Sequence, residues 1–307
     1  MIRNVFGHSV QGASHKINDI PCQDNFLKKE CEGDTLILAV ADGHGSQACP
    51  YSEKGSRIAT RVFYRTMRDL CEAYADDQEK LLTYLNREGA ERTAQAIDAT
   101  WKKEVVRAHK QAGHEFPVSS DCAPQKEKPQ TKRPHPRTDI EQKEKEEIYR
   151  QYGTTLIGLL ITPVFFFAFQ LGDGDITFVD DDGVDSVVRC EKILGVETHS
   201  LCKVGAWEHA VTVVRRREAC MRLPQAFMLS TDGFANSYKN DEEFEKTCLD
   251  YFAMIREHGA KAVNDNLKEW LSETSELGCG DDITLLVAYF DESQIKTECS
   301  SDDANIE

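Results

Sequence analysis

Residues 35–46 read Thr-Leu-Ile-Leu-Ala-Val-Ala-Asp-Gly-His-Gly-Ser, an apolar run that ends in a polar, glycine-rich stretch. The run has the length and β-branched content of a buried strand. Asp42 then lies where the strand leaves the core, and the glycines beside it allow the backbone to approach a ligand closely. Taken alone, the same residues also fit a strand that ends in an ordinary Asp-Gly turn.

The same pattern recurs near the C-terminus. An apolar strand predicted over 226–230 is followed by Asp232, and Asp281 precedes a strand predicted over 283–290. In an antiparallel arrangement the end of one strand and the start of another lie at the same edge. We therefore expect these acids to meet Asp42.

Two further acids, Asp24 and Asp173, also lie at predicted strand junctions. Several carboxylates held within a few ångströms repel one another unless a cation neutralises them. Oxygen-only ligands favour hard ions, so Mg²⁺ or Mn²⁺ is expected rather than zinc. Two such ions sharing one carboxylate can activate water and bind a phosphoryl group.

Composition limits the classes of function. The chain has 307 residues, 40% of them hydrophobic, and a formal net charge of -16, which argues against binding nucleic acid or an anionic membrane. Its 11 cysteines are odd in number and include no CxxC pair. With no signal-peptide pattern at the start, we expect free thiols and a cytoplasmic protein.

Residues 156–171 are strongly apolar and could be mistaken for a membrane span. They fall short of the roughly 20 residues that a spanning helix needs. Thr162 and Pro163 also interrupt the run midway. Two buried strands joined by a tight turn explain the aromatic and β-branched content better.

Apolar residues at helical spacing predict four helices between the strands, over 51–74, 78–110, 241–257 and 260–276. We expect residues 12–16 to form a loop. Residues 113–147 are rich in proline and charge and predict a disordered or extended insertion. The organisation expected is one domain over 1–290 with this insertion, followed by an acidic disordered tail over 291–307.

Five segments together resemble the metal-dependent Ser/Thr protein phosphatases of type 2C, especially their compact bacterial branch. Their order and spacing cover most of the chain outside the insertion and the tail. The segments are Gln23-Asp24, Ala41-Asp42-Gly43-His44-Gly45, Leu171-Gly172-Asp173, Ser230-Thr231-Asp232-Gly233 and Gly280-Asp281-Asp282-Ile283-Thr284. The resemblance implies an α+β fold, a four-layer α-β-β-α sandwich in which two antiparallel sheets are flanked by helices.

The resemblance also implies roles for single residues. Asp42 would bridge two metal ions, and the Gly43 carbonyl would bind one of them. Asp232 and Asp281 would complete one shell, while Asp24 would act on the other ion through water.

Asp173 would join Asp232 at a weaker third metal position. His44 occupies the place of the general acid that protonates the departing Ser or Thr oxygen. An imidazole pKa of ~6.5 suits that task.

The chain departs from the family pattern at several positions. Gln23 stands where many members carry a metal-binding Glu, and Asp282 replaces the usual Asn. Asp175 falls where many members carry an Arg. No Arg lies at the usual distance before Asp24, so His15 and Lys16 are the candidates for phosphate binding.

The function implied is a cytoplasmic phosphoprotein phosphatase that hydrolyses phosphoserine and phosphothreonine by direct attack of a metal-bridging hydroxide. Phosphorylated proteins and a cognate Ser/Thr kinase are the expected partners, with no nucleic acid or membrane and a monomeric chain. We expect residues 180–218, where the family has a variable flap, to shape substrate choice. The alternatives are a catalytically weak regulatory module on the same fold and a phosphatase of small phosphorylated metabolites.

Overall fold

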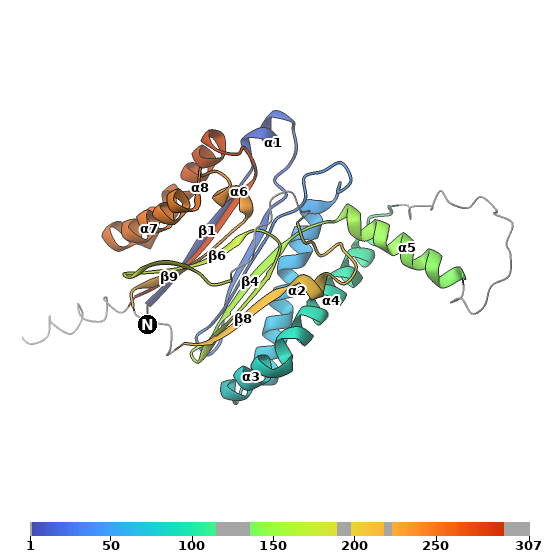
Figure 1. The fold of residues 1–307 in the computed structure, drawn as a ribbon, viewed down its shortest axis with the longest axis horizontal. Helices are drawn as coiled ribbons and strands as arrows, with labels where there is room; N and C mark the ends of the chain where they lie inside the picture. Colours follow the sequence, from blue (N-terminus) through green and yellow to red (C-terminus); the bar gives the residue numbers. More distant parts are fainter. Residues whose placement is uncertain (1, 115–135, 189–197, 218–222, 292–307) are drawn as a thin grey trace, which may run out of the picture.

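Two antiparallel sheets lie face to face, with helices covering both outer surfaces (Figure 1). The computed structural model describes residues 2–114, 136–188, 198–217 and 223–291. The first sheet has the strand order β1 (Ile2–Val10), β10 (Ile283–Asp291), β9 (Gln225–Ser230), β6 (Asp175–Asp180), β7 (Gly183–Ser186). The second has the order β2 (Asn25–Cys31), β3 (Thr35–Ala41), β4 (Leu156–Ile161), β5 (Phe165–Leu171), β8 (Val211–Arg216).

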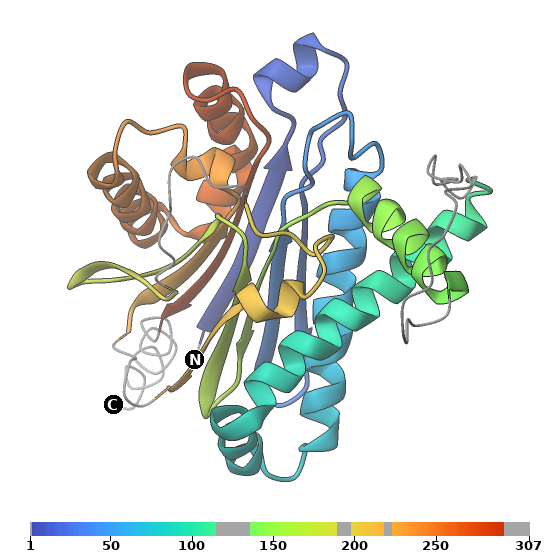
Figure 2. The ribbon, with the colours of Figure 1, turned by 45° about the vertical axis from the view of Figure 1, so that its right-hand side comes forward.

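Long helices form the two outer layers. In Figure 2 the helices of the second sheet lie on one side and those of the first sheet on the other. The second sheet carries α2 (Ser52–Ala73), α3 (Gln78–Tyr84), a π-helical turn (Leu85–Gly89), α4 (Ala90–Gln111) and α5 (Pro136–Gln151). The first carries α7 (Asp241–His258) and α8 (Ala260–Leu277). Short helices are α1 (Ala13–Ile17), η2 (Ala206–His209) and α6 (Asp232–Ala235).

Strand β3 explains why the layers hold together. All seven of its residues are buried, and successive side chains point to opposite faces. Leu36, Leu38 and Val40 contribute to the core between the sheets, whereas Ile37 and Ala39 pack into the core beneath α2 and α4. A third apolar core lies between the first sheet and the helices α7 and α8. The four-layer α-β-β-α sandwich is confirmed.

The apolar run at 156–171 is a hairpin of two buried strands, β4 and β5, as predicted. None of the helices in the described ranges is both long and apolar enough to cross a membrane. The four predicted helices are also present, although the one over 78–110 contains the π-helical turn.

Two predictions about loops were wrong. Residues 13–17 form the short helix α1. Residues 136–147 of the expected disordered insertion belong to α5, because this charged segment is rich in helix formers and is anchored by buried Ile148 and Tyr152 at its end. The rest of the insertion from 115 to 135, part of the flap (189–197) and the tail from 292 lie outside the described residues.

Candidate metal centre

Strand register brings the five predicted acids to one end of the sandwich. Asn25 pairs with Ala41, so Asp24 and Asp42 leave their strands side by side. In the other sheet Ser230 pairs with both Asp175 and Leu285, which brings the β5–β6 turn, the end of β9 and the start of β10 together. Helices α1 and α6 lie at this same end (Figure 1).

The backbone of Asp42 is fixed by the two residues that precede the neighbouring strand β4. Its N–H donates to the Thr155 hydroxyl at 3.0 Å, and its carbonyl accepts from the Thr155 N–H at 2.8 Å and the Thr154 hydroxyl at 2.7 Å. Gly43 is required beside it, because a Cβ there would lie 2.7 Å from the Gln23 carbonyl oxygen. The turn after β3 therefore has one tightly packed conformation.

Asp24 is almost fully buried, yet only one of its oxygens is hydrogen-bonded. Oδ2 accepts from the hydroxyls of Thr231 and Thr284, both at 2.8 Å. Oδ1 has no hydrogen-bond partner among the described residues, and neither does the buried Oε1 of Gln23. Two buried oxygen acceptors without donors call for an explanation.

The other three acids have individual partners. Asp173 accepts from the Thr198 hydroxyl at 2.6 Å, and Asp232 accepts from the Asn236 amide at 2.9 Å. Asp281 is half-exposed and accepts from the N–H of the following residue at 2.8 Å. Each retains oxygen acceptors for a further ligand.

The carboxylates interact electrostatically as one cluster centred on Asp42. Burial raises the pKa of Asp42 well above its ordinary value, and the charges of Asp24, Asp232, Asp281 and Asp173 raise it further. Burial also raises the pKa of Asp24 to about 8 and that of Asp232 to about 6, with neighbouring carboxylates adding to both shifts. Each shift reflects first the removal of the carboxylate from water and then the negative charges near it.

This donor set fits hard divalent cations. It consists of oxygens only and is strongly anionic, and Asp24 Oδ1, like the nearby Gln23 Oε1, has no hydrogen-bond donor among the described residues. Within the described ranges, no group of three or more His, Cys, Asp or Glu side chains is placed so that all of them could hold one metal ion.

His44 lies on the same turn, two residues after Asp42. Its N–H donates to the Gly153 carbonyl at 3.1 Å, and its half-buried ring lies directly against Gly153. The structure thus holds the His44 backbone next to the turn of Asp42. Its predicted role as general acid stays a prediction.

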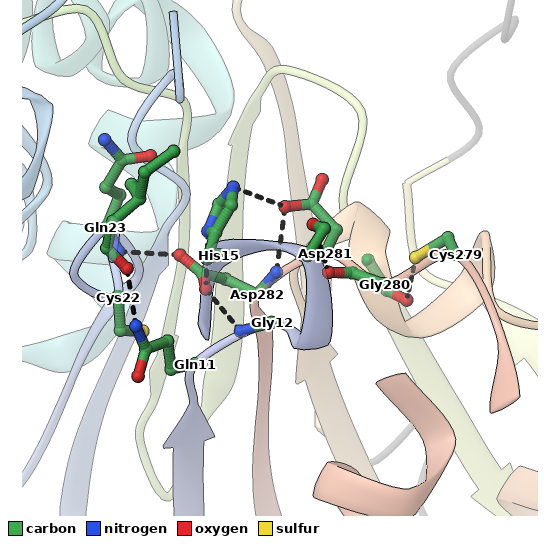
Figure 3. A network of polar contacts seen from close by, with 12 residues as sticks. Gln11, Gly12, His15, Cys22, Gln23, Cys279, Gly280, Asp281 and Asp282 are labelled. Carbon is green, nitrogen blue, oxygen red and sulfur yellow. Dashed lines mark hydrogen bonds and ion pairs between the residues drawn. The ribbon is translucent and has the colours of Figure 1, made fainter. Parts of the chain in front are cut away.

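His15 and Lys16, the two candidates for phosphate binding, lie in different surroundings. The ring of His15 has Nδ1 at 2.9 Å from Asp282 Oδ1 and Nε2 at 3.7 Å from Asp281 Oδ1 (Figure 3). Lys16 instead pairs with Glu276 of α8 at 3.5 Å. Of the two, His15 lies at the carboxylate cluster.

Sequence reasoning missed the hydroxyls that support the acids. Thr231 and Thr284 were part of the quoted motifs, but no role was assigned to them, although they fix Asp24. Thr198 lies 25 residues from Asp173, which it contacts, and no local sequence pattern predicts that contact. Asp282 was recognised only as a departure from the family pattern.

Comparison with known proteins gives a consistent result. A family model described as Protein phosphatase 2C matches residues 11–272. No curated protein sequence matches the chain. Similar solved structures include the catalytic domain of the serine/threonine protein phosphatase PstP in complex with two manganese ions, with a TM-score of 0.56 and 13% identity over 94% of this chain and 99% of that one.

Two further structures share the fold. They are the S. agalactiae serine/threonine phosphatase, with a TM-score of 0.55 and 14% identity over 94% of this chain and 100% of that one, and the Mycobacterium tuberculosis phosphatase PstP/Ppp, with a TM-score of 0.53 and 13% identity over 95% and 100%. At this identity the likeness shows the fold, while the family model spans most of the chain. The chain belongs to the protein phosphatase 2C family.

Proposed function

We propose that this protein is a metal-dependent phosphatase that hydrolyses phosphoserine and phosphothreonine in proteins. The observation that supports it most is the convergence of four carboxylates on Asp42, whose pKa is raised by burial and by those four charges. A folded chain gains nothing from such repulsion unless a ligand neutralises it. Membership of the phosphatase family supplies the class of reaction.

Two divalent cations, Mn²⁺ or Mg²⁺, are the cofactors proposed, with a weaker third. The residues proposed to hold them are Asp24, Asp42, Gly43, Asp173, Asp232 and Asp281. When bound, such ions supply an activated water and neutralise charge on the phosphoryl oxygens.

The chain's own groups have separate tasks in this proposal. Asp42, fixed by Thr154 and Thr155, keeps its carboxylate at the centre of the cluster. His44 gives a proton to the departing Ser or Thr oxygen, and His15 contacts the phosphoryl group. Because proton donation matters most for a poor leaving group, His44 matters more for phosphopeptides than for aryl phosphates.

The test combines a binding and an activity measurement on the full chain. Calorimetry with Mn²⁺ and with Mg²⁺ measures cation binding. Hydrolysis of phosphoserine and phosphothreonine peptides is then followed with each ion and with excess chelator. We expect binding at micromolar to millimolar metal and hydrolysis that the chelator abolishes.

The alternatives give different results in the same experiment. Cation binding without hydrolysis of any phosphate ester would favour a regulatory module. Hydrolysis of small phosphorylated metabolites in preference to peptides would favour a metabolite phosphatase. Absence of any cation binding would contradict the proposed metal centre itself.

A further inference from the structure

Asp282 has a role that its neighbour Asp281 does not share. Its side chain is 3% exposed and contacts three N–H groups from two stretches of chain, residues 12–15 and Gln23 (Figure 3). Oδ1 accepts from the Gly12 N–H at 2.7 Å and lies 2.9 Å from His15 Nδ1, and Oδ2 accepts from the Gln23 N–H at 2.7 Å. Asp282 thus joins the end of β1, helix α1 and the residue before Asp24.

These contacts require a carboxylate. Donors approach both oxygens of Asp282, and an Asn side chain would present an NH₂ group to one of them. A buried N–H left without an acceptor costs about 1–3 kcal/mol. The two backbones also pack closely here, because a Cβ on Gly12 would lie 2.7 Å from the Asp282 nitrogen.

The contact with Asp282 determines which ring nitrogen of His15 is available to a ligand. With Nδ1 donating to Asp282, the remaining nitrogen Nε2 lies 3.7 Å from Asp281 Oδ1. Nε2 would also lie 3.4 Å from a Cβ on Gly45, so it sits between Asp281 and the turn that carries Asp42. The ring is held at the edge of the carboxylate cluster.

We propose that Asp282 is a positioning residue that holds His15 in place to contact the phosphoryl group of the substrate. In that contact Nδ1 faces Asp282 Oδ1, and Nε2 is the ring nitrogen turned to a phosphoryl oxygen. This inference rests on the proposed phosphatase function. It adds to that function a buried carboxylate that acts on the substrate only through His15.

A double-mutant cycle tests the coupling. His15→Ala, Asp282→Asn and the double variant are compared with wild type for kcat and KM on one phosphopeptide, at saturating Mn²⁺. Loss of one charge-assisted hydrogen bond to phosphate raises KM about tenfold to a hundredfold. We expect the double variant to be no worse than the worse single variant.

Matched controls are available elsewhere in the chain. Asp98→Asn removes another buried carboxylate, which pairs with Lys102 on α4, and His258→Ala removes an exposed imidazole at the end of α7. Neither should change KM. Losses that multiply in the double variant would overturn the positioning role, because Asp282 would then act independently of His15.

Nitrogen-15 NMR of histidine-labelled protein in the Mg²⁺ form supplies a readout other than activity, with inorganic phosphate as the probe. In wild type we expect His15 to carry hydrogen on Nδ1 and its Nε2 signal to move when phosphate is added. An unchanged Nε2 signal, or hydrogen on Nε2 alone, would overturn the inference. The same spectra apply if Asp282→Asn fails to fold.

The two proposals fail in different ways. If wild type hydrolyses no phosphate ester, the proposed function fails, and phosphate binding measured by NMR still decides the role of His15. If wild type is active while His15→Ala leaves KM unchanged, only the further inference fails.

Discussion

Two buried carboxylates, Asp24 and Asp282, differ in how their oxygens are used. They are near neighbours, since the charge of Asp282 helps to raise the pKa of Asp24. Both oxygens of Asp282 are engaged by N–H groups. In Asp24 one oxygen accepts from two threonine hydroxyls, and the other has no hydrogen-bond partner in the described ranges.

The difference separates a structural carboxylate from one suited to a ligand. Three N–H donors compensate the negative charge of Asp282 within the protein itself. Asp24 is only partly compensated: burial and the charge of Asp282 raise its pKa, and its own charge helps to raise the pKa of Asp42. A cation supplies the missing compensation there, whereas at Asp282 none is needed.

The largest effect is expected when the centre of the cluster loses its charge. Asp42→Asn should lower Mn²⁺-dependent phosphopeptide hydrolysis about a thousandfold or more, because it removes the carboxylate proposed to bind both ions. In metal-free protein near pH 8, the same change should raise the melting temperature by relieving repulsion. Asp282→Asn should lower it, since a buried N–H loses its acceptor.

Activity assays and thermal unfolding with chelator check both halves of this prediction. Asp98→Asn serves as the matched control with a buried carboxylate outside the cluster. Full activity in Asp42→Asn would contradict the metal centre. Melting temperatures that move in the same direction in the Asp42 and Asp282 variants would remove the distinction between the two kinds of carboxylate.

Substitutions of the two histidines near these carboxylates, His44 and His15, should change different kinetic constants. His44→Ala should slow phosphopeptide hydrolysis about a hundredfold through kcat, because a general acid contributes that much to expulsion of a poor leaving group. An aryl phosphate, with a good leaving group, should be affected only slightly. His15→Ala should instead raise KM for both substrates.

Parallel kinetics on a phosphopeptide and an aryl phosphate check this difference. Equal losses on the two substrates in His44→Ala would argue against proton donation by His44. The exposed His258 provides the control variant.

A smaller effect is expected in the pH dependence of stability. The pKa of Asp24 is raised to about 8 and that of Asp232 to about 6, so the folded metal-free protein holds protons that the unfolded chain has lost. The free energy of unfolding should therefore fall as pH rises from about 5 to 8. Saturating Mg²⁺ should flatten this dependence, because the cation takes the place of the protons.

Unfolding in urea across that pH range, with chelator and with Mg²⁺, measures the two slopes. Asp42→Asn should have a shallower slope without metal than wild type. A metal-free stability that rises with pH over this range would contradict the raised pKa values.

Much of the fold followed from local patterns. Residues 35–41 are almost all apolar, so a buried strand was predicted and is confirmed. Helix α5 was missed because most of its residues are charged, and it depends on the packing of Ile148 and Tyr152 at one end. A single sequence does not reveal such tertiary support.

The centre of the site was more predictable than its support. Asp42 directly follows the apolar run of a strand, so its place at the end of that strand can be predicted from neighbouring residues. The role of Asp282 depends on partners 259 to 270 residues away, at Gln23, His15 and Gly12. Contacts so distant in sequence arise from the pairing of β1 with β10, which no local motif encodes.

The smallest effect is expected at a threonine that supports Asp24. The Thr284 hydroxyl donates to Asp24 Oδ2 at 2.8 Å and shares a 2.6 Å hydrogen bond with the Ser9 hydroxyl. Thr284→Val keeps the shape of the side chain and leaves the Thr231 hydroxyl on the same oxygen. Loss of one donor disfavours the ionised form of Asp24, so Mn²⁺ affinity should fall a few-fold near neutral pH.

Calorimetry measures that change against Thr177→Val, which removes a buried hydroxyl bonded to the Met228 carbonyl at 3.3 Å in the first sheet. If both valine variants bind Mn²⁺ as wild type does, the partly compensated state of Asp24 has no bearing on the cation, and its contrast with Asp282 is structural alone.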